Sequence, residues 1–114
     1  FSPLYVKDLK KIINFFLKKE VKGVFNLGGP EQLSRYDCIN IILHLLGKKI
    51  KSKIIIKKTL IKNVNTLDKR PLDVSMDIKK IKKVINFKLK KFATIANIII
   101  EKNNAKHKIL KRRH

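Results

Sequence analysis

The side chain best suited to bind an anionic ligand is that of Arg70, in the segment Arg70-Pro71-Leu72-Asp73. A planar guanidinium contacts two oxygens of a phosphate or carboxylate at once, whereas a lysine ammonium acts as a point charge. An arginine before a proline, in a loop between elements, fits this role, so Arg70 is predicted to bind substrate. The alternative is a structural ion pair between Arg70 and Asp73 or Asp77.

A second group of polar residues lies on one face of a predicted helix. Asp37, Asn40 and His44 are spaced i, i+3 and i+7. Metal ligands can use this spacing, but a solvated helix face has the same pattern, and no further His or Cys supports a site. We therefore predict no metal ligands here. Cys38 is the single cysteine, predicted to pack as a small apolar residue in a cytoplasmic protein.

A glycine turn follows the first predicted strand, in the segment 23–37, GVFNLGGPEQLSRYD. The apolar run 23–27 is typical of a short strand. Gly28 and Gly29 are predicted to take positive φ, which lets the strand reverse into the next helix without a Cβ clash. The turn is predicted to have a structural role.

Apolar periodicity and end signals predict four helices, with further strands between them. Ser34 is the predicted N-cap of the second helix, Asp37 completes a capping box, and Gly47 ends the helix. Asp77 is predicted to cap the third helix, whose Ile78, Ile81 and Ile85 share a face. The helices are expected near residues 8–19, 35–46, 78–85 and 92–102, and the further strands at 51–61 and 74–76.

The charge of the chain is strongly positive, with 29 Lys and Arg against 8 Asp and Glu, a net charge of +21. Such a charge favours nucleic acid or an anionic membrane as partner. Only four of these residues are arginines, however, and the lysines are scattered among Ile and Asn, as in a protein encoded by A- and T-rich DNA. We therefore predict weak, non-specific nucleic-acid binding and no membrane partner, since no run approaches 18 apolar residues.

Three motifs resemble the C-terminal part of the extended short-chain dehydrogenase/reductases, in the branch of the dTDP-4-dehydrorhamnose reductases. They are YVKDL (5–9), the segment 23–37, and RPLDVSMDIKKI (70–81). The resemblance implies an α/β fold, the C-terminal fragment of a Rossmann-type protein, in which short strands alternate with about four helices. Residues 1–100 would form a substrate-binding lobe that includes a last strand of the Rossmann sheet, and residues 101–114 a basic tail.

The resemblance implies a fragment of an NAD(P)-dependent sugar-nucleotide reductase, in which Arg70 binds the nucleotide-sugar substrate. NAD(P) and the catalytic Tyr-x-x-x-Lys pair would belong to a missing N-terminal Rossmann domain. Tyr5 and Tyr36 have no lysine four residues later, and the four glycines do not form G-x-x-G-x-x-G. The chain is therefore predicted to contain no catalytic residue, to bind no cofactor and to be inactive alone.

Two alternatives remain open on the sequence. The first is a catalytically idle regulatory subunit of the same family, similar to the beta subunit of methionine adenosyltransferase. The second is a small basic nucleic-acid-binding module, for which the tail KHKILKRRH (106–114) is the best support. The chain starts at Phe1 without an initiator Met, and we expect it to be a piece of a longer protein.

Overall fold

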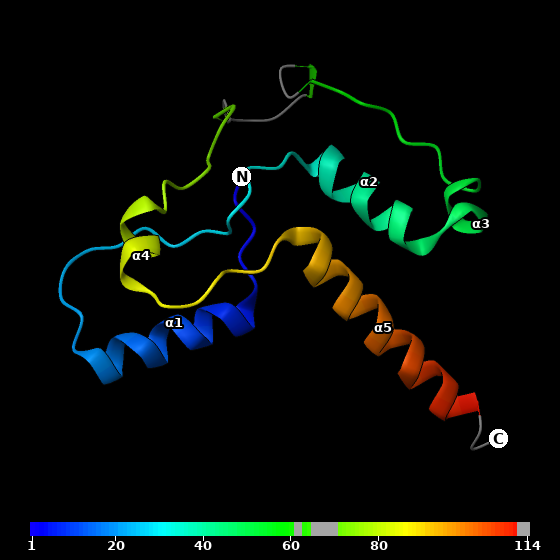
Figure 1. Ribbon diagram of the computed structural model, residues 1–114. Coiled ribbons are helices and arrows are strands. Elements are labelled where there is room, and N and C mark those ends of the chain that lie inside the picture. Colours follow the sequence, from blue (N-terminus) through cyan, green and yellow to red (C-terminus); the bar gives the residue numbers. More distant parts are fainter. Residues whose placement is uncertain (61–62, 65–70, 112–114) are drawn as a thin grey trace.

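The structure, a computed structural model, describes residues 1–60, 63–64 and 71–111 (Figure 1). Within these residues the chain forms helices and no β-strand, so the predicted α/β fold is wrong. The helices are α1 (Val6–Lys19), α2 (Arg35–Leu46), α3 (Lys48–Lys51), α4 (Lys79–Val84) and α5 (Phe92–Lys111).

The segments predicted as strands are extended but do not form a ladder. β-branched residues favour extended backbone, yet a strand also needs a partner that hydrogen-bonds along its length. Instead, neighbouring segments are joined by a few hydrogen bonds that do not form a ladder, such as the reciprocal pair between Phe1 and Leu33. The Gly29 N–H donates to the Ser2 carbonyl at 3.1 Å, and the Met76 N–H donates to Ser2 Oγ at 3.2 Å. The structure therefore lacks the predicted strands at 23–27 and 74–76. It also lacks the predicted strand at 51–61 over its described part, residues 51–60.

The main core is a cluster of isoleucines between α1 and α4. Ile12 and Ile81 are each 1% exposed, and Ile78 and Ile85 complete the cluster. All three isoleucines predicted to share a face of the third helix are buried in this cluster, but α4 spans Lys79–Val84, with Ile78 as its N-cap and Ile85 as its C-cap. Half-buried apolar side chains surround it: Phe15, Phe16, Phe25, Phe87 and Leu89.

An ion pair with a buried carboxylate and a partly exposed lysine joins the first turn of α1 to the segment before α5. The Asp8 carboxylate is 1% exposed and accepts hydrogen bonds from the Lys90 N–H at 2.7 Å and from Lys90 Nζ at 3.2 Å. A buried carboxylate is tolerated only when it is paired in this way. The pair therefore fixes the segment 85–91 against the isoleucine core.

A second packing unit consists of α2 and α5, which lie against each other. Its buried residues are Cys38, Leu43, Ile95 and Ala96. The predicted bounds of α2 are confirmed, as is its capping box: the Asp37 N–H donates to Ser34 Oγ, and the Ser34 N–H donates to Asp37 Oδ2. Gly47, with φ 86°, ends the helix as predicted.

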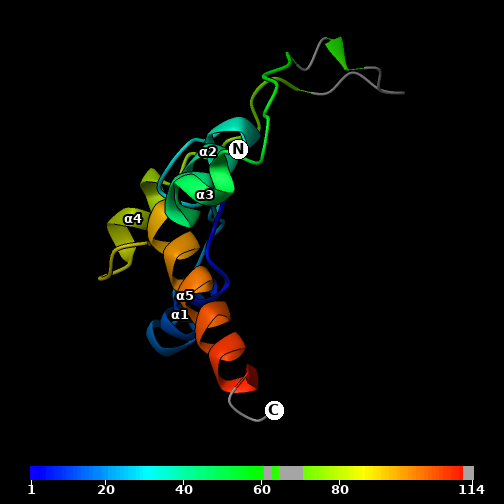
Figure 2. The same cartoon turned by 90° about the vertical axis from the view of Figure 1, so that its right-hand side faces the viewer.

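Helix α5 is longer than the sequence indicated. Its first N–H, that of Phe92, donates to Glu31 Oε2 at 2.8 Å, so a side chain distant in sequence caps it. The helix was expected to end at residue 102 but continues to Lys111, and its C-terminal half projects from the body (Figures 1 and 2). The division into residues 1–100 and 101–114 remains a prediction.

Gly28 and Gly29 are required for a reason other than the predicted one. The glycines with positive φ are Gly23 and Gly47, so the predicted positive φ at Gly28 and Gly29 is wrong. Both are buried where the segments 1–4, 26–33 and 74–78 cross. A Cβ on Gly29 would overlap the Pro3 carbonyl oxygen, and one on Gly28 would lie 3.0 Å from Met76 Cβ. Close approach of the backbones therefore demands glycine here.

The molecule as a whole is open. Its accessible surface is 10041 Å², whereas a compact monomer of this mass exposes roughly 6,500 Å². The radius of gyration is 18.2 Å, against about 13 Å for a compact chain of this length. Figure 2 shows the segment that follows α3 leaving the body of the molecule. Among the described helices, none combines the length and apolarity needed to cross a bilayer.

Candidate anion-binding site on helix α4

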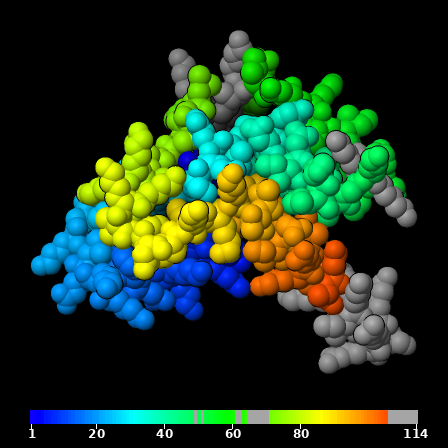
Figure 3. Space-filling view, viewed as in Figure 1, coloured from blue at the N-terminus to red at the C-terminus, as the bar shows by residue number. Residues whose placement is uncertain are grey.

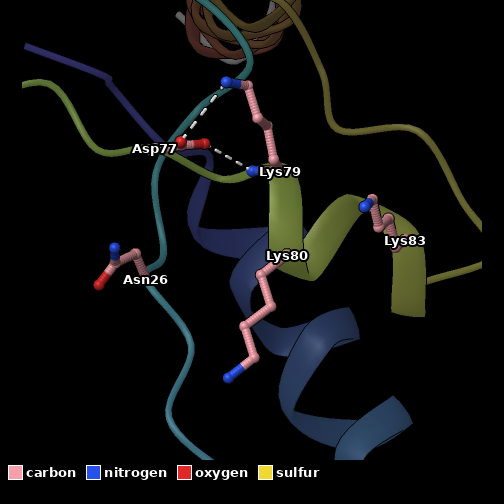
Figure 4. A pocket seen from close by; sticks show the side chains of 5 residues that line it. All are labelled: Asn26, Asp77, Lys79, Lys80 and Lys83. Atoms are coloured by element: carbon pink, nitrogen blue, oxygen red, sulfur yellow. Dashed lines mark hydrogen bonds and ion pairs between the residues drawn. The ribbon is translucent and has the colours of Figure 1, made fainter.

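A pocket of about 410 Å³ opens beside α4 (Figure 4). Helix α4 and the residues before it supply three lysines and an aspartate, and the extended segment opposite supplies an amide. This site, called the lysine pocket below, is lined by Asn26, Asp77, Lys79, Lys80 and Lys83. Three ammonium groups and one carboxylate leave it with an excess of positive charge.

Lys79 forms a weak contact with the single carboxylate. Asp77 Oδ1 accepts a hydrogen bond from the Lys79 N–H at 2.9 Å, but the N-cap of α4 is Ile78, one residue after the predicted Asp77. The Lys79 ammonium lies 3.7 Å from Asp77 Oδ2, and both side chains are largely exposed. Solvent screening makes such a surface pair worth little, so an incoming anion can compete with Asp77 for Lys79.

Lys80 is the fixed member of the group. Its Nζ donates to the Val24 carbonyl at 2.7 Å and lies 4.6 Å from the centre of the Phe25 ring. An ammonium has three donors, so two remain for a ligand after the bond to Val24. Lys80 thus also ties α4 to the extended segment that carries Asn26.

Lys83 is the cation with most freedom to bind a ligand. Among the described residues, no carboxylate pairs with its ammonium. In Figure 4 the Lys79, Lys80 and Lys83 side chains point in different directions. A bound anion therefore needs rotations of flexible lysine side chains, which cost entropy and keep its affinity low. The pocket offers donors for an anion from Lys83, Lys79 and the Asn26 amide, which do not converge on one point in Figure 4.

Arg70, the predicted substrate-binding residue, lies outside the described residues. Asp73, one of its possible partners, accepts hydrogen bonds from Gln32 Nε2 at 2.6 Å and from the Ser75 hydroxyl at 2.6 Å. The hydrogen bonds from Ser75 lower the pKa of the Asp73 carboxyl. The role of Arg70 stays a prediction.

The polar face of α2 is occupied by local hydrogen bonds. Asp37 belongs to the capping box, and the Asn40 amide donates to the Tyr36 carbonyl at 3.0 Å. His44 is exposed. No group of three metal-ligating side chains occurs in the part of the chain that the structure describes. Cys38 is buried, as predicted, and its burial raises the pKa of the thiol.

Sequence reasoning missed the lysine pocket because lysine is common throughout the chain. The run KKIKK at 79–83 places Lys79 and Lys83 one helical turn apart, which was the available signal. Nothing in the sequence marks Asn26, which a crossing of distant segments brings to α4. With a net charge of +21, a cluster of three lysines does not stand out from its surroundings.

Comparison with known proteins gives one functional indication. A curated phosphate acetyltransferase from Buchnera aphidicola subsp. Acyrthosiphon pisum (strain APS) is 40% identical over 68 residues, covering 54% of this chain and 10% of that protein. The chain thus spans about a tenth of the length of this relative. Neither a protein-family model nor a solved structure matches the chain.

These findings contradict the resemblance to short-chain dehydrogenase/reductases. The motifs that carried it are short, and the predicted strands are absent. The curated match is a phosphate acetyltransferase, so the predicted fragment of a sugar-nucleotide reductase is wrong, and the regulatory-subunit and nucleic-acid-module alternatives gain no support. NAD(P), the nucleotide sugar and the Rossmann domain concern partners outside this chain, and nothing tests them.

Proposed function

We propose that this chain binds a phosphate-bearing ligand in the lysine pocket, as part of a larger enzyme that acts on phosphate. The observation that carries the proposal is the pocket itself, which is lined by three lysines (Lys79, Lys80 and Lys83) and one carboxylate, that of Asp77. Lysine ammonium groups and an amide N–H are donors suited to phosphate oxygens. The similarity to a protein named phosphate acetyltransferase supports phosphate over other oxyanions.

The side chains that line the pocket have different roles in binding. Lys83, which has no carboxylate partner among the described residues, supplies the main charge-assisted contact. Lys79 adds a second contact when it leaves Asp77. Lys80 keeps its bond to Val24 and thereby holds the extended segment, so that Asn26 stays opposite α4. Asp77 opposes binding because its negative charge repels phosphate.

The test is to titrate the chain with inorganic phosphate and with acetyl phosphate at low salt, and to measure binding by calorimetry and by ¹H–¹⁵N NMR. Lys83→Gln is expected to weaken binding about 5-fold, the scale of one exposed charge-assisted contact. Asp77→Asn removes the repulsion but keeps an oxygen acceptor for the Lys79 N–H, so it is expected to strengthen binding. Lys53→Gln, an exposed lysine elsewhere, controls for the loss of one charge.

Equal weakening by Lys83→Gln and Lys53→Gln would overturn the proposal, because the effect would then come from net charge alone. NMR chemical-shift changes spread over all lysine-rich segments would also overturn the proposal, because they would indicate non-specific binding. Shifts confined to residues 26 and 77–83 would support it.

We also propose two further properties of the chain, one concerning nucleic acid and one concerning its location in the cell. Weak, sequence-independent contact with nucleic acid is supported by the +21 charge and should fade steeply as salt rises. A cytoplasmic location is supported by the presence of a single cysteine, because one cysteine cannot form a disulfide within this chain and a free thiol suits a reducing compartment.

A further inference from the structure

A second pocket, of about 580 Å³, lies beyond α4, between its C-terminal end and the segment that leads to α5. Its floor is apolar and its rim is basic. We call it the apolar pocket, and it shares no lining residue with the lysine pocket. The segment that forms most of it lies on the face seen in Figure 3, coloured yellow.

The floor consists of side chains that also belong to the core. Ile85 is 8% exposed, and Phe87 and Leu89 pack against the isoleucine cluster. The Phe87 ring meets the Phe15 ring edge-on at 6.3 Å. The ion pair between Asp8 and Lys90 fixes the backbone that carries these residues. The floor is therefore held in place before any ligand arrives, which lowers the entropic cost of binding.

The rim carries three exposed lysines: Lys82, Lys88 and Lys91. No carboxylate lines the pocket, and none pairs with these ammonium groups among the described residues. Two acidic side chains nearby are already engaged. Asp8 pairs with Lys90, and Glu31 caps α5 through the Phe92 N–H. The rim therefore has positive charge that nothing in its lining neutralises.

Floor and rim together define the ligand. A purely inorganic anion would leave the apolar floor unused, and a neutral apolar molecule would leave the lysines without a partner. A small molecule with an apolar body and a terminal carboxylate matches both, because the body covers Phe87 and Leu89 while the carboxylate reaches Lys88 or Lys91. The volume falls within the range of small-molecule sites, about 300–1,000 Å³.

From this complementarity we propose that the apolar pocket binds a small apolar carboxylate, such as a medium-chain fatty acid or an aromatic acid. The site is independent of the lysine pocket, and its ligand chemistry differs in needing an apolar body. Burial of that body supplies most of the affinity, at about 25 cal/mol per Å², while the lysines orient the molecule.

The experiment uses octanoate as the probe, below the concentration at which it aggregates. Acetate carries the same charge without the apolar body, and octanol carries the body without the charge. We expect octanoate to bind at least about 10-fold more tightly than either, because each lacks one of the two contributions. Chemical shifts should move at residues 85–91 and remain constant at 26 and 79–80.

The variant Lys88→Gln/Lys91→Gln should weaken octanoate binding about 10-fold, since it removes two rim charges. The matched control is Lys53→Gln/Lys57→Gln, which removes two exposed charges after α3. Circular dichroism checks that each variant is folded. The chemical-shift changes of the unaltered chain test the proposal even if a variant does not fold.

Three results would overturn the proposal. Octanol binding as tightly as octanoate would show that the lysines play no part, and acetate binding as tightly would show the same of the floor. Equal weakening by the two double variants would reduce the effect to net charge.

Discussion

The isoleucine core and the extended segment 54–60 are built from the same residue types but have opposite burial. Ile81 on α4 is 1% exposed, whereas Ile55 is 94% exposed. The core is closed by α1, by Phe25 and by the segment 87–89, all of which bring apolar side chains to α4. The segment 54–60 follows α3 and leaves the body of the molecule (Figures 1 and 2). Ile54 in this segment is 46% exposed.

The difference shows that residue type alone does not decide burial in this chain. An apolar side chain gains free energy only when a second apolar surface covers it. In the core that surface is brought by three separate stretches of sequence. Where no such stretch covers it, an apolar side chain such as Ile55 stays exposed.

One of the two largest predicted effects on stability concerns the ion pair that closes the core. Lys90→Met keeps an apolar stem but leaves the buried Asp8 carboxylate without its cation. The unfolding free energy should fall by about 3 kcal/mol, the low end of the cost of a buried charge without its partner, because the Lys90 side chain is 32% exposed and the Lys90 N–H still donates to Asp8. Urea unfolding followed by circular dichroism measures the loss. Lys7→Met, an exposed lysine next to Asp8 in sequence, should change stability by less than about 0.5 kcal/mol.

The comparison between core and segment is tested directly by two truncations. Ile81→Ala should lower the unfolding free energy by about 3 kcal/mol, since it removes buried methyl groups and leaves a cavity. Ile55→Ala removes the same atoms from an exposed position and should cost less than about 0.5 kcal/mol. Similar losses for both variants in urea unfolding would mean that the segment 54–60 packs in solution.

A smaller effect is expected where the extended segments cross. Gly29→Ala places a methyl group against the Pro3 carbonyl, so the two backbones must separate, at a cost of about 2 kcal/mol. Gly28→Ala meets Met76 Cβ at 3.0 Å and Ser2 Cβ at 3.2 Å, a smaller overlap, so the segments need to separate less. Thermal melts should therefore rank Gly29→Ala below Gly28→Ala. The reverse order would contradict the described crossing.

Local features of the chain were predictable from sequence, and their long-range partners were not. Ser34, Asp37 and Gly47 fixed the bounds of α2, because caps depend on residues within one turn. The face of Ile78, Ile81 and Ile85 followed from helical periodicity. The strands failed because the extended preference of 54–60 is local, whereas a ladder depends on a distant partner that the described chain does not provide.

The candidate sites show the same limit. The lysines of α4 were visible in the sequence, but their number elsewhere hid them. Asn26 and Pro30 reach the two pockets through the crossing at Gly28 and Gly29, which periodicity does not reveal. Arg70 had a sound chemical argument, yet its position lies outside the described residues.

The smallest predicted effect concerns pH and the exposed cap of α2. The hydrogen bonds from the Ser34 hydroxyl and backbone N–H lower the pKa of the Asp37 carboxyl below its ordinary value of 3.8. Because the folded chain holds this proton less tightly, the cap stabilises fully above pH 3.8, and the contribution disappears as the pH falls through the lowered pKa. Asp37→Asn should therefore melt slightly below the unaltered chain near neutral pH, and the difference should vanish in acid. Glu20→Gln, which removes an exposed carboxylate outside the cap, controls for the charge. A melting difference that persists unchanged in acid would show that the Asp37 charge does not stabilise α2.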